Sequence, residues 1–235
     1  MIGWPRLDAP KKIGILGGTF DPPHMGHLKL ATHFSKQLQL DELLLIPSGQ
    51  PWQKDTAITS AEIRFQLTEA AAIELARAFL YLNIPTKIGI DRIEIDRAGP
   101  SYAIDTIKSL RERFGKKASL IWLMGLDSLI NLPTWNSWQE LLDYMNLAIA
   151  GRPHYDLQEQ LPVEIDKLLR EHQSLETQAL ATTSHGYIYL DQSLSVDLSS
   201  TELRNRLKTL SRSTVTPEQI PSRTLEIITS LGLYQ

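Results

Sequence analysis

No cysteine occurs among the 235 residues, which excludes a disulfide framework and a thiol nucleophile. The chain also lacks an apolar stretch near the ~18 residues that a membrane span needs, and its first residues do not resemble an export signal. A basic surplus is missing as well, because 24 Lys and Arg face 27 Asp and Glu and the formal net charge is −3. Nucleic-acid binders usually carry such a surplus to neutralise backbone phosphates. We therefore expect a cytoplasmic protein that binds small anions, with no nucleic-acid or membrane partner.

What the chain does contain is a regular alternation of short apolar runs and amphipathic segments. Its length and its hydrophobic content of 42% are sufficient for the core of one large α/β domain. The segments between the apolar runs are long enough for crossover helices, so the fold class predicted is α/β, a doubly wound and mostly parallel sheet. The strands expected are Ile13–Leu16, Leu43–Ile46, Ile88–Ile95, Leu120–Met124, Leu147–Ala150 and Tyr187–Leu190. Between the second and third of them, apolar residues at steps of four and three predict the buried stripe of a helix, formed by Ile63, Leu67, Ala71, Leu75 and Ala78.

The most informative segment is Gly17–His27, with the sequence Gly-Gly-Thr-Phe-Asp-Pro-Pro-His-Met-Gly-His. It follows the first expected strand and leads into the periodic stretch Leu28–Phe34, so it predicts a strand, a glycine turn and a helix start. Glycines there let the backbone approach a ligand closely, and a helix N-terminus offers free N–H groups to an anion. The segment therefore predicts a site for a nucleotide phosphate.

The two histidines sharpen this prediction. His24 and His27 are three residues apart and share one helical face, so both imidazoles can reach one phosphate group. Two other interpretations stay open, that the pair caps the helix or that it binds zinc. Zinc normally takes three or four ligands, and no third partner is evident nearby.

A second segment, Ser199–Arg204, lies near the other end of the chain and begins a helix with Leu203, Leu207 and Leu210 on its apolar face. Ser199 and Glu202 match a capping box, which alone accounts for those two residues. It does not account for Arg204, because a cation near a helix N-terminus opposes the helix dipole at a cost of up to ~1 kcal/mol. An anion bound at that terminus would reverse the sign of this effect.

These two segments resemble the signature motifs of the bacterial nicotinate-mononucleotide adenylyltransferases, in the nucleotidyltransferase superfamily. The family motifs are Gly-Gly-Thr-Phe-Asp-Pro-X-His-X-Gly-His and Ser-Ser-Thr-X-hydrophobic-Arg, and every fixed position of both is matched. The resemblance continues through Pro100–Thr106, Gly125–Asp127, Leu132–Trp135, Arg152–Pro153, Ile220–Pro221 and Gly232–Tyr234. The stretch from about His154 to His185 is individual, and its Glu164–His172 part predicts a polar, peripheral helix. We expect His33, His154, His172 and His185 to be solvated.

The resemblance implies a single domain over residues 1–235, with the C-terminal helices from about 199 to 235 completing an ATP site. It also implies transfer of AMP from ATP to nicotinate mononucleotide, giving deamido-NAD and pyrophosphate. His24 would contact the α-phosphate, His27 the neighbouring phosphate and Arg204 the outer phosphates, and Mg²⁺ would be bound mainly through the phosphates of ATP, with no protein metal site. The ATP-binding residues implied are Gly17, Gly18, Thr19, Phe20, His24, His27, Gly125, Asp127, Ser199, Ser200, Thr201 and Arg204. Asp21 is interpreted only as a turn residue before two prolines.

The site for the second substrate departs from the family pattern. Ala103 stands where threonine is common, Asn136 where an aromatic residue is common, and Trp52-Gln53-Lys54 where Pro-His-Lys is common. In the family, backbone N–H groups hold the pyridine carboxylate, and these survive a change of side chain. We expect Ala103 and Asn136 to lie in the site for the second substrate. Trp135 is expected to stack on the pyridine ring, with a core role as its alternative, and Lys54 is expected to contact a phosphate. Trp138 is expected in the core.

Three other functions stay open. One is transfer to another small acceptor, such as pantetheine phosphate or glycerol phosphate; a second is a fragment of an aminoacyl-tRNA synthetase; a third is a nucleotide-sensing module without turnover. The sequence does not decide between the acid and amide forms of the pyridine substrate, and it leaves a homo-oligomer open.

Overall fold

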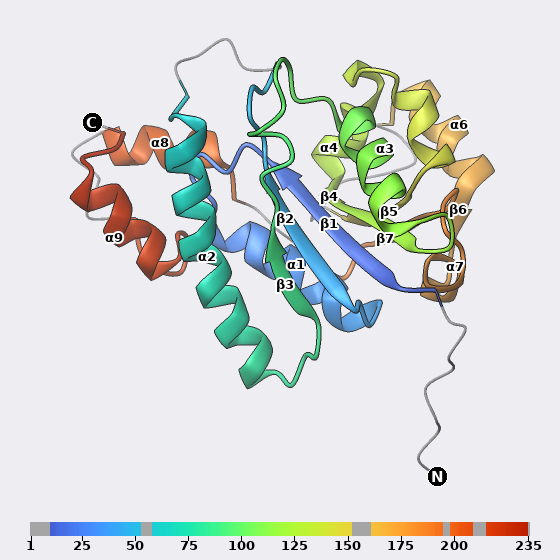
Figure 1. Cartoon of the computed structure of the whole chain (residues 1–235), viewed down its shortest axis with the longest axis horizontal. Coiled ribbons are helices and arrows are strands. Elements are labelled where there is room, and N and C mark those ends of the chain that lie inside the picture. The colour runs from blue at the N-terminus through green and yellow to red at the C-terminus, as the bar shows by residue number, and fades with distance from the viewer. Residues whose placement is uncertain (1–9, 53–57, 152–160, 195–197, 209–214, 235) are drawn as a thin grey trace.

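The computed structural model describes residues 10–52, 58–151, 161–194, 198–208 and 215–234, and these contain a seven-stranded sheet (Figure 1). The strand order is β3-β2-β1-β4-β5-β7-β6, and all neighbouring strands are parallel. The strand bounds are β1 Lys12–Gly18, β2 Glu42–Pro47, β3 Lys87–Ile90, β4 Ser119–Gly125, β5 Asn146–Ala150, β6 Gln173–Ser174 and β7 Ile188–Asp191. The predicted α/β fold class is confirmed. Because the order reverses between β1 and β4, the carboxyl ends of these two strands open the crevice in which such sheets bind ligands.

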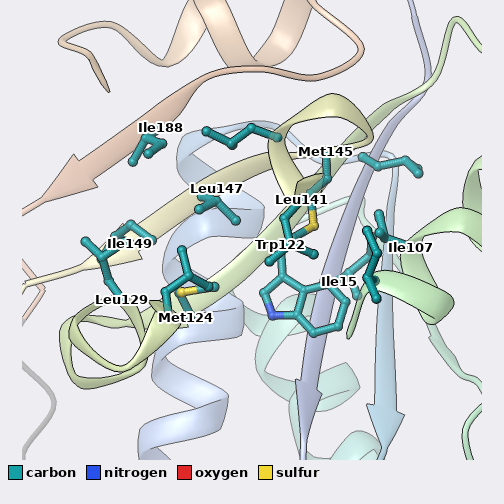
Figure 2. Packing of buried hydrophobic residues seen from close by; sticks show 14 of the residues in the cluster. Ile15, Ile107, Trp122, Met124, Leu129, Leu141, Met145, Leu147, Ile149 and Ile188 are labelled. Carbon is teal, nitrogen blue, oxygen red and sulfur yellow. The ribbon is translucent and has the colours of Figure 1, made fainter. Parts of the chain in front are cut away.

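Helices cover both faces of the sheet because successive strand residues point to opposite sides. On β4, Trp122 and Met124 face one side and Ile121 and Leu123 face the other. The first side is covered by α3 (Ala103–Phe114), α4 (Leu126–Ile130), α6 (Val163–His172) and the short 3-10 helices Leu132–Thr134 and Trp138–Asp143. Figure 2 shows this core, with Ile107 of α3 close to Ile15 and Trp122. The second side is covered by α1 (Met25–Gln37), α2 (Ala61–Tyr81) and α7 (Thr177–Thr182).

A third, smaller core lies away from the sheet and fixes the C-terminal helices. It joins α2 to α8 (Ser200–Lys208) and α9 (Ser222–Ser230) through six buried side chains, Leu67, Leu203, Leu207, Val215, Ile220 and Ile228. Figure 1 shows α9, coloured red, beside α2. Of the predicted stripe on α2, Leu67, Ala71 and Leu75 are buried, whereas Ile63 and Ala78 are partly exposed.

Several local predictions need correction. The third strand ends at Ile90 and not at Ile95, because the Asp91 carboxylate accepts the Ile93 N–H at 3.0 Å and begins a turn. The polar helix expected at Glu164–His172 is α6, and Ile165 and Leu169 on it are buried. His33 is not simply solvated, since its Nε2 lies 2.7 Å from Oδ2 of the buried Asp191. Nor is His172, whose Nδ1 lies 2.9 Å from the Gly186 carbonyl oxygen.

Of the other positions named from sequence, His185 is exposed as expected, while His154, Arg152–Pro153 and Leu210 lie outside the described residues. No helix in the described ranges has both the length and the apolar character of a membrane span.

Candidate active site

The glycine turn leads from β1 directly into α1, as the sequence predicts. His24 is the N-cap residue of α1, with extended backbone at φ −136° and ψ 169°. Its backbone N–H donates to Nδ1 of His27 at 3.1 Å, and the two imidazole centroids are 3.8 Å apart. The capping interpretation is therefore correct for Nδ1 of His27. It also fixes the tautomer, because a neutral ring whose Nδ1 accepts a hydrogen bond carries its proton on Nε2.

His24 is buried, with 6% of its surface exposed. Burial lowers its pKa to about 4, so the imidazole is neutral at pH 7. Its Nδ1 is buried and has no hydrogen-bond partner among the described residues. Since an unsatisfied buried polar atom is costly, this nitrogen is suited to a ligand that completes its hydrogen bonding.

Lowering the pH should destabilise the protein through His24. The unfolded chain binds a proton at this imidazole near pH 6.5 and the folded chain only near pH 4. The full stability is therefore present above about pH 6.5, and up to about 3 kcal/mol is lost as the pH falls to about 4. Urea unfolding of the wild type and of His24→Gln between pH 7 and pH 4.5 gives the free energy of unfolding at each pH. The contribution of His24 is the difference between the two proteins in how steeply this free energy falls as the pH is lowered. Equal slopes would contradict the burial of a neutral imidazole; His185→Gln, at an exposed histidine, is the control.

A cavity of about 400 Å³ opens beside the two histidines, at the carboxyl ends of the central strands. Ten of the predicted site residues line it, namely Gly17, Gly18, Thr19, His24, His27, Ala103, Gly125, Asp127, Trp135 and Asn136. Gly17 is needed for a steric reason, because a Cβ there would lie 2.5 Å from Cζ2 of Trp122, which lines the same cavity.

Other predicted residues lie elsewhere. Phe20 does not line the cavity; its buried ring packs with its edge against His27, at a centroid distance of 5.0 Å. Lys54 lies outside the described residues. Ser199, Ser200, Thr201 and Arg204 are not part of the cavity lining, although Leu198 is.

The second motif nevertheless meets the first. Ser200, the first residue of α8, donates its hydroxyl hydrogen to the Pro22 carbonyl at 3.0 Å. Nη1 of Arg204 donates to the Asp21 carbonyl at 2.7 Å, and Nη2 to Oγ1 of Thr201 at 3.3 Å. The guanidinium therefore lies against the turn that leads to His24. The backbone N–H of Leu203 donates to the Ser199 carbonyl at 3.0 Å, which is consistent with a helix starting at this point.

Trp135 combines features of its two interpretations. It lines the cavity, and it also packs against the core, with its ring edge-on to Trp122 at a centroid distance of 6.3 Å. Trp138 packs against the same core, as expected. Trp52, which is 42% exposed, also lines the cavity, and its ring centroid lies 6.1 Å from that of Tyr102.

Sequence reasoning missed Arg64, a buried arginine that holds three loops at the site. Its guanidinium donates to the carbonyls of Thr19 at 2.8 Å, Ser48 at 2.5 Å and Gly49 at 2.9 Å, and its Nε donates to the Thr59 carbonyl at 2.9 Å. Burial lowers its pKa, and the nearby Asp21 carboxylate opposes that shift. The signal in the sequence that could have revealed it is a charged residue next to Ile63, on the apolar stripe of α2.

Glu94 and Ser101 were also missed, and they shape the wall next to Ala103. Glu94 is buried, which raises the pKa of its carboxyl group, and it accepts the Thr106 hydroxyl hydrogen at 2.7 Å. Oγ of Ser101 accepts the backbone N–H groups of Gly49 at 2.9 Å and Gln50 at 3.1 Å. Gly49 cannot be replaced without a shift, since a Cβ there would lie 2.1 Å from the Glu94 carbonyl oxygen.

Comparison with known proteins agrees with this geometry. The sequence matches the family described as cytidylyltransferase-like over residues 15–206. It is 35% identical to a Herminiimonas arsenicoxydans protein named "Probable nicotinate-nucleotide adenylyltransferase", over 95% of this chain and 96% of that protein. A protein of the same name from Aeromonas hydrophila is 41% identical over 84% of this chain and 86% of its own length.

The fold comparison points the same way. The structure of the Plasmodium falciparum nicotinic acid mononucleotide adenylyltransferase complexed with NaAD matches 95% of this chain and 97% of its own chain, with a TM-score of 0.67 and 17% identity. The chain thus belongs to the cytidylyltransferase-like family, a class of nucleotidyltransferases with this parallel sheet. Within that class it belongs to the nicotinate-nucleotide adenylyltransferases.

Proposed function

We propose that this chain transfers AMP from ATP to nicotinate mononucleotide, giving deamido-NAD and pyrophosphate. The observation that carries the proposal is the pair of adjacent imidazoles in the cavity where the strand order reverses. The Arg204 guanidinium lies against the turn that leads to these imidazoles. A helix N-terminus with neutral imidazoles at such a crevice, and a guanidinium next to it, is suited to a nucleotide phosphate chain.

In this proposal the ATP phosphates lie along the glycine turn and the start of α1. His24 contacts the α-phosphate, His27 the neighbouring phosphate and Arg204 the outer phosphates, together with hydroxyls from Ser199–Thr201. Gly125 and Asp127, which line the cavity where β4 ends, hold the adenosine ribose. Gly17, Gly18, Thr19 and Phe20 contribute backbone N–H groups, and the C-terminal helices complete the site.

The mononucleotide occupies the other part of the cavity. Ala103 begins α3, so backbone N–H groups there are available to the pyridine carboxylate. Trp135 stacks on the pyridine ring, Asn136 lies beside it, and Lys54 contacts a phosphate.

The chemistry needs no general base. The attacking group is a phosphate monoester oxygen, and with a second pKa of ~6 the monoester is mostly dianionic at pH 7. A bond forms from this oxygen to the α-phosphorus as the bond to the bridging oxygen of pyrophosphate breaks in line. What the protein supplies is positioning of two anions that repel each other and neutralisation of the charge that develops on the leaving oxygens.

Mg²⁺ enters with ATP in this proposal. In the described part of the chain no group of three or more His, Cys, Asp or Glu side chains is arranged to hold a metal ion. The side chains at the turn are imidazoles, whereas Mg²⁺ prefers oxygen ligands, so phosphate oxygens and water would supply its coordination.

The test is pyrophosphate release with ATP alone and then with each acceptor. We expect release with nicotinate mononucleotide, and lower release with its amide counterpart, pantetheine phosphate, glycerol phosphate or no acceptor. Preferred turnover of another phosphate acceptor would replace the substrate assignment. ATP binding without release with any acceptor would favour a nucleotide sensor.

Replacing Trp135 with alanine should raise KM for nicotinate mononucleotide about tenfold, because stacking on the pyridine ring is lost. KM for ATP in the same variant is the internal control and should stay near the wild-type value. Trp135→Phe, which keeps an aromatic face, should recover most of the loss. If KM for the mononucleotide does not change in Trp135→Ala, the residue belongs to the core alone.

A further inference from the structure

The Asp21 carboxylate is an unexplained feature of the motif turn. It is buried, with 1% of the residue exposed, and the transfer chemistry above does not use it. Its Oδ1 accepts the Tyr234 hydroxyl hydrogen at 2.6 Å, and its Oδ2 accepts the Thr59 backbone N–H at 3.4 Å. Nη1 of Arg204 lies 4.0 Å from Oδ2 and donates to the carbonyl of the same residue at 2.7 Å. One side chain thus contacts three segments that are far apart in the sequence.

Tyr234 is held in an uncommon conformation to make this contact. Helix α9 ends at Ser230, Gly232 in the turn that follows has φ 60°, and the Leu233 N–H donates to the Ile228 carbonyl at 3.0 Å. Tyr234 follows with φ 60° of its own, a left-handed value that is unfavourable for a residue with a side chain. Burial and the neighbouring Asp21 carboxylate raise the pKa of the phenol, so it stays protonated and donates its hydrogen.

The carboxylate also lies within the field of two arginines. Arg204 approaches it from α8, and Arg64, which binds the Thr19 carbonyl two residues earlier in the chain, is also stabilised in its charged form by Asp21. A buried carboxylate that accepts two hydrogen bonds and lies near two cations is well compensated. Removing the phenol hydrogen bond would free Asp21 to move toward either guanidinium, and Arg204 would lose its fixed orientation.

We infer that Tyr234 and Asp21 are positioning residues for the reaction, which hold the Arg204 guanidinium at a fixed position relative to His24. The inference rests on the proposed role of Arg204 at the ATP phosphates. It assigns to the segment after α9 a part in ATP use that no contact with the cavity would suggest, since neither residue lines it.

Steady-state kinetics of Tyr234→Phe test this inference, because only the hydroxyl is removed. We expect kcat/KM for ATP to fall roughly tenfold while KM for nicotinate mononucleotide stays unchanged, since one hydrogen bond to a charged group is lost. Tyr81→Phe, at a tyrosine that is 85% exposed, is the matched control and should behave like the wild type. Asp21→Asn, which keeps the shape and removes the charge, should lower kcat/KM for ATP further, by roughly 10- to 100-fold.

A double-mutant cycle separates positioning from a general structural role. If Tyr234 acts through Arg204, then Tyr234→Phe should have little further effect in an Arg204→Ala background. Additive losses, or Tyr234→Phe kinetics equal to those of Tyr81→Phe, would overturn the inference while leaving the proposed function in place. Absence of pyrophosphate release from the wild type and from Tyr81→Phe with every acceptor would instead mean that the proposed function fails.

Discussion

Replacing His24 with alanine is expected to lower kcat by roughly 10²- to 10³-fold, the usual loss for one preorganised electrostatic donor. The imidazole is neutral and buried in the free protein, and its Nδ1 has no partner among the described residues. Negative charge near the α-phosphate would strengthen its hydrogen bond most in the transition state, so the loss falls on kcat more than on KM for the mononucleotide.

The measurement is pyrophosphate release at saturating ATP and mononucleotide. His185→Ala, at an exposed histidine, should keep wild-type turnover. Thermal midpoints of both variants show whether the helix start survives, since the backbone N–H of residue 24 can still donate to His27. Unchanged turnover in His24→Ala would remove this residue from the proposed chemistry.

Replacing Arg204 with alanine should have a similarly large effect, with kcat/KM for ATP falling roughly 10²-fold. Hydrogen bonds between ions contribute ~1.5–3 kcal/mol each, and the planar guanidinium can donate two of them to phosphate oxygens. Arg204→Lys keeps the charge but not the fork, so we expect it to recover only part of the loss.

Kinetics with ATP varied at fixed mononucleotide measure this effect. Lys208→Ala removes an exposed cation from the same helix and is the control for a general change of surface charge. A value of kcat/KM for ATP in Arg204→Ala equal to that of Lys208→Ala would place the guanidinium outside the phosphate site and restrict it to tying α8 to the Asp21 turn.

The parts of the fold that follow local rules could be predicted from the sequence. The central strands and the buried part of the α2 stripe follow from periodicity, because a strand or helix face is repeated every few residues. The third strand could not be bounded, since its apolar pattern continues past Ile90 and only the Asp91 side chain ends it. The two-residue strand β6 is too short to give a pattern.

The same distinction holds at the site. The glycine turn and the histidine pair are contiguous, so their placement in the cavity could be predicted. Capping by the pair is one of the interpretations that the sequence leaves open, and only the structure shows that Nδ1 of His27 is the nitrogen that caps the helix. The contact between Arg204 and Asp21 joins residues 183 apart, and no local periodicity encodes it. Arg64, Glu94 and the partner of His33 were missed for a related reason. Their roles depend on which backbone groups and carboxylates meet them after folding, and a lone charged residue in a sequence does not indicate this.

The C-terminal helices are fastened to α2 by a small core of six side chains that is separate from the two cores flanking the sheet. Proteins open in cooperative pieces whose stability depends on how much apolar surface each piece buries. Fraying of this small piece would carry Arg204 and Tyr234 away from the motif turn while the sheet and both imidazoles stay in place. Activity can therefore be lost while the sheet stays folded. Mild denaturing conditions would abolish activity before most of the secondary structure is lost.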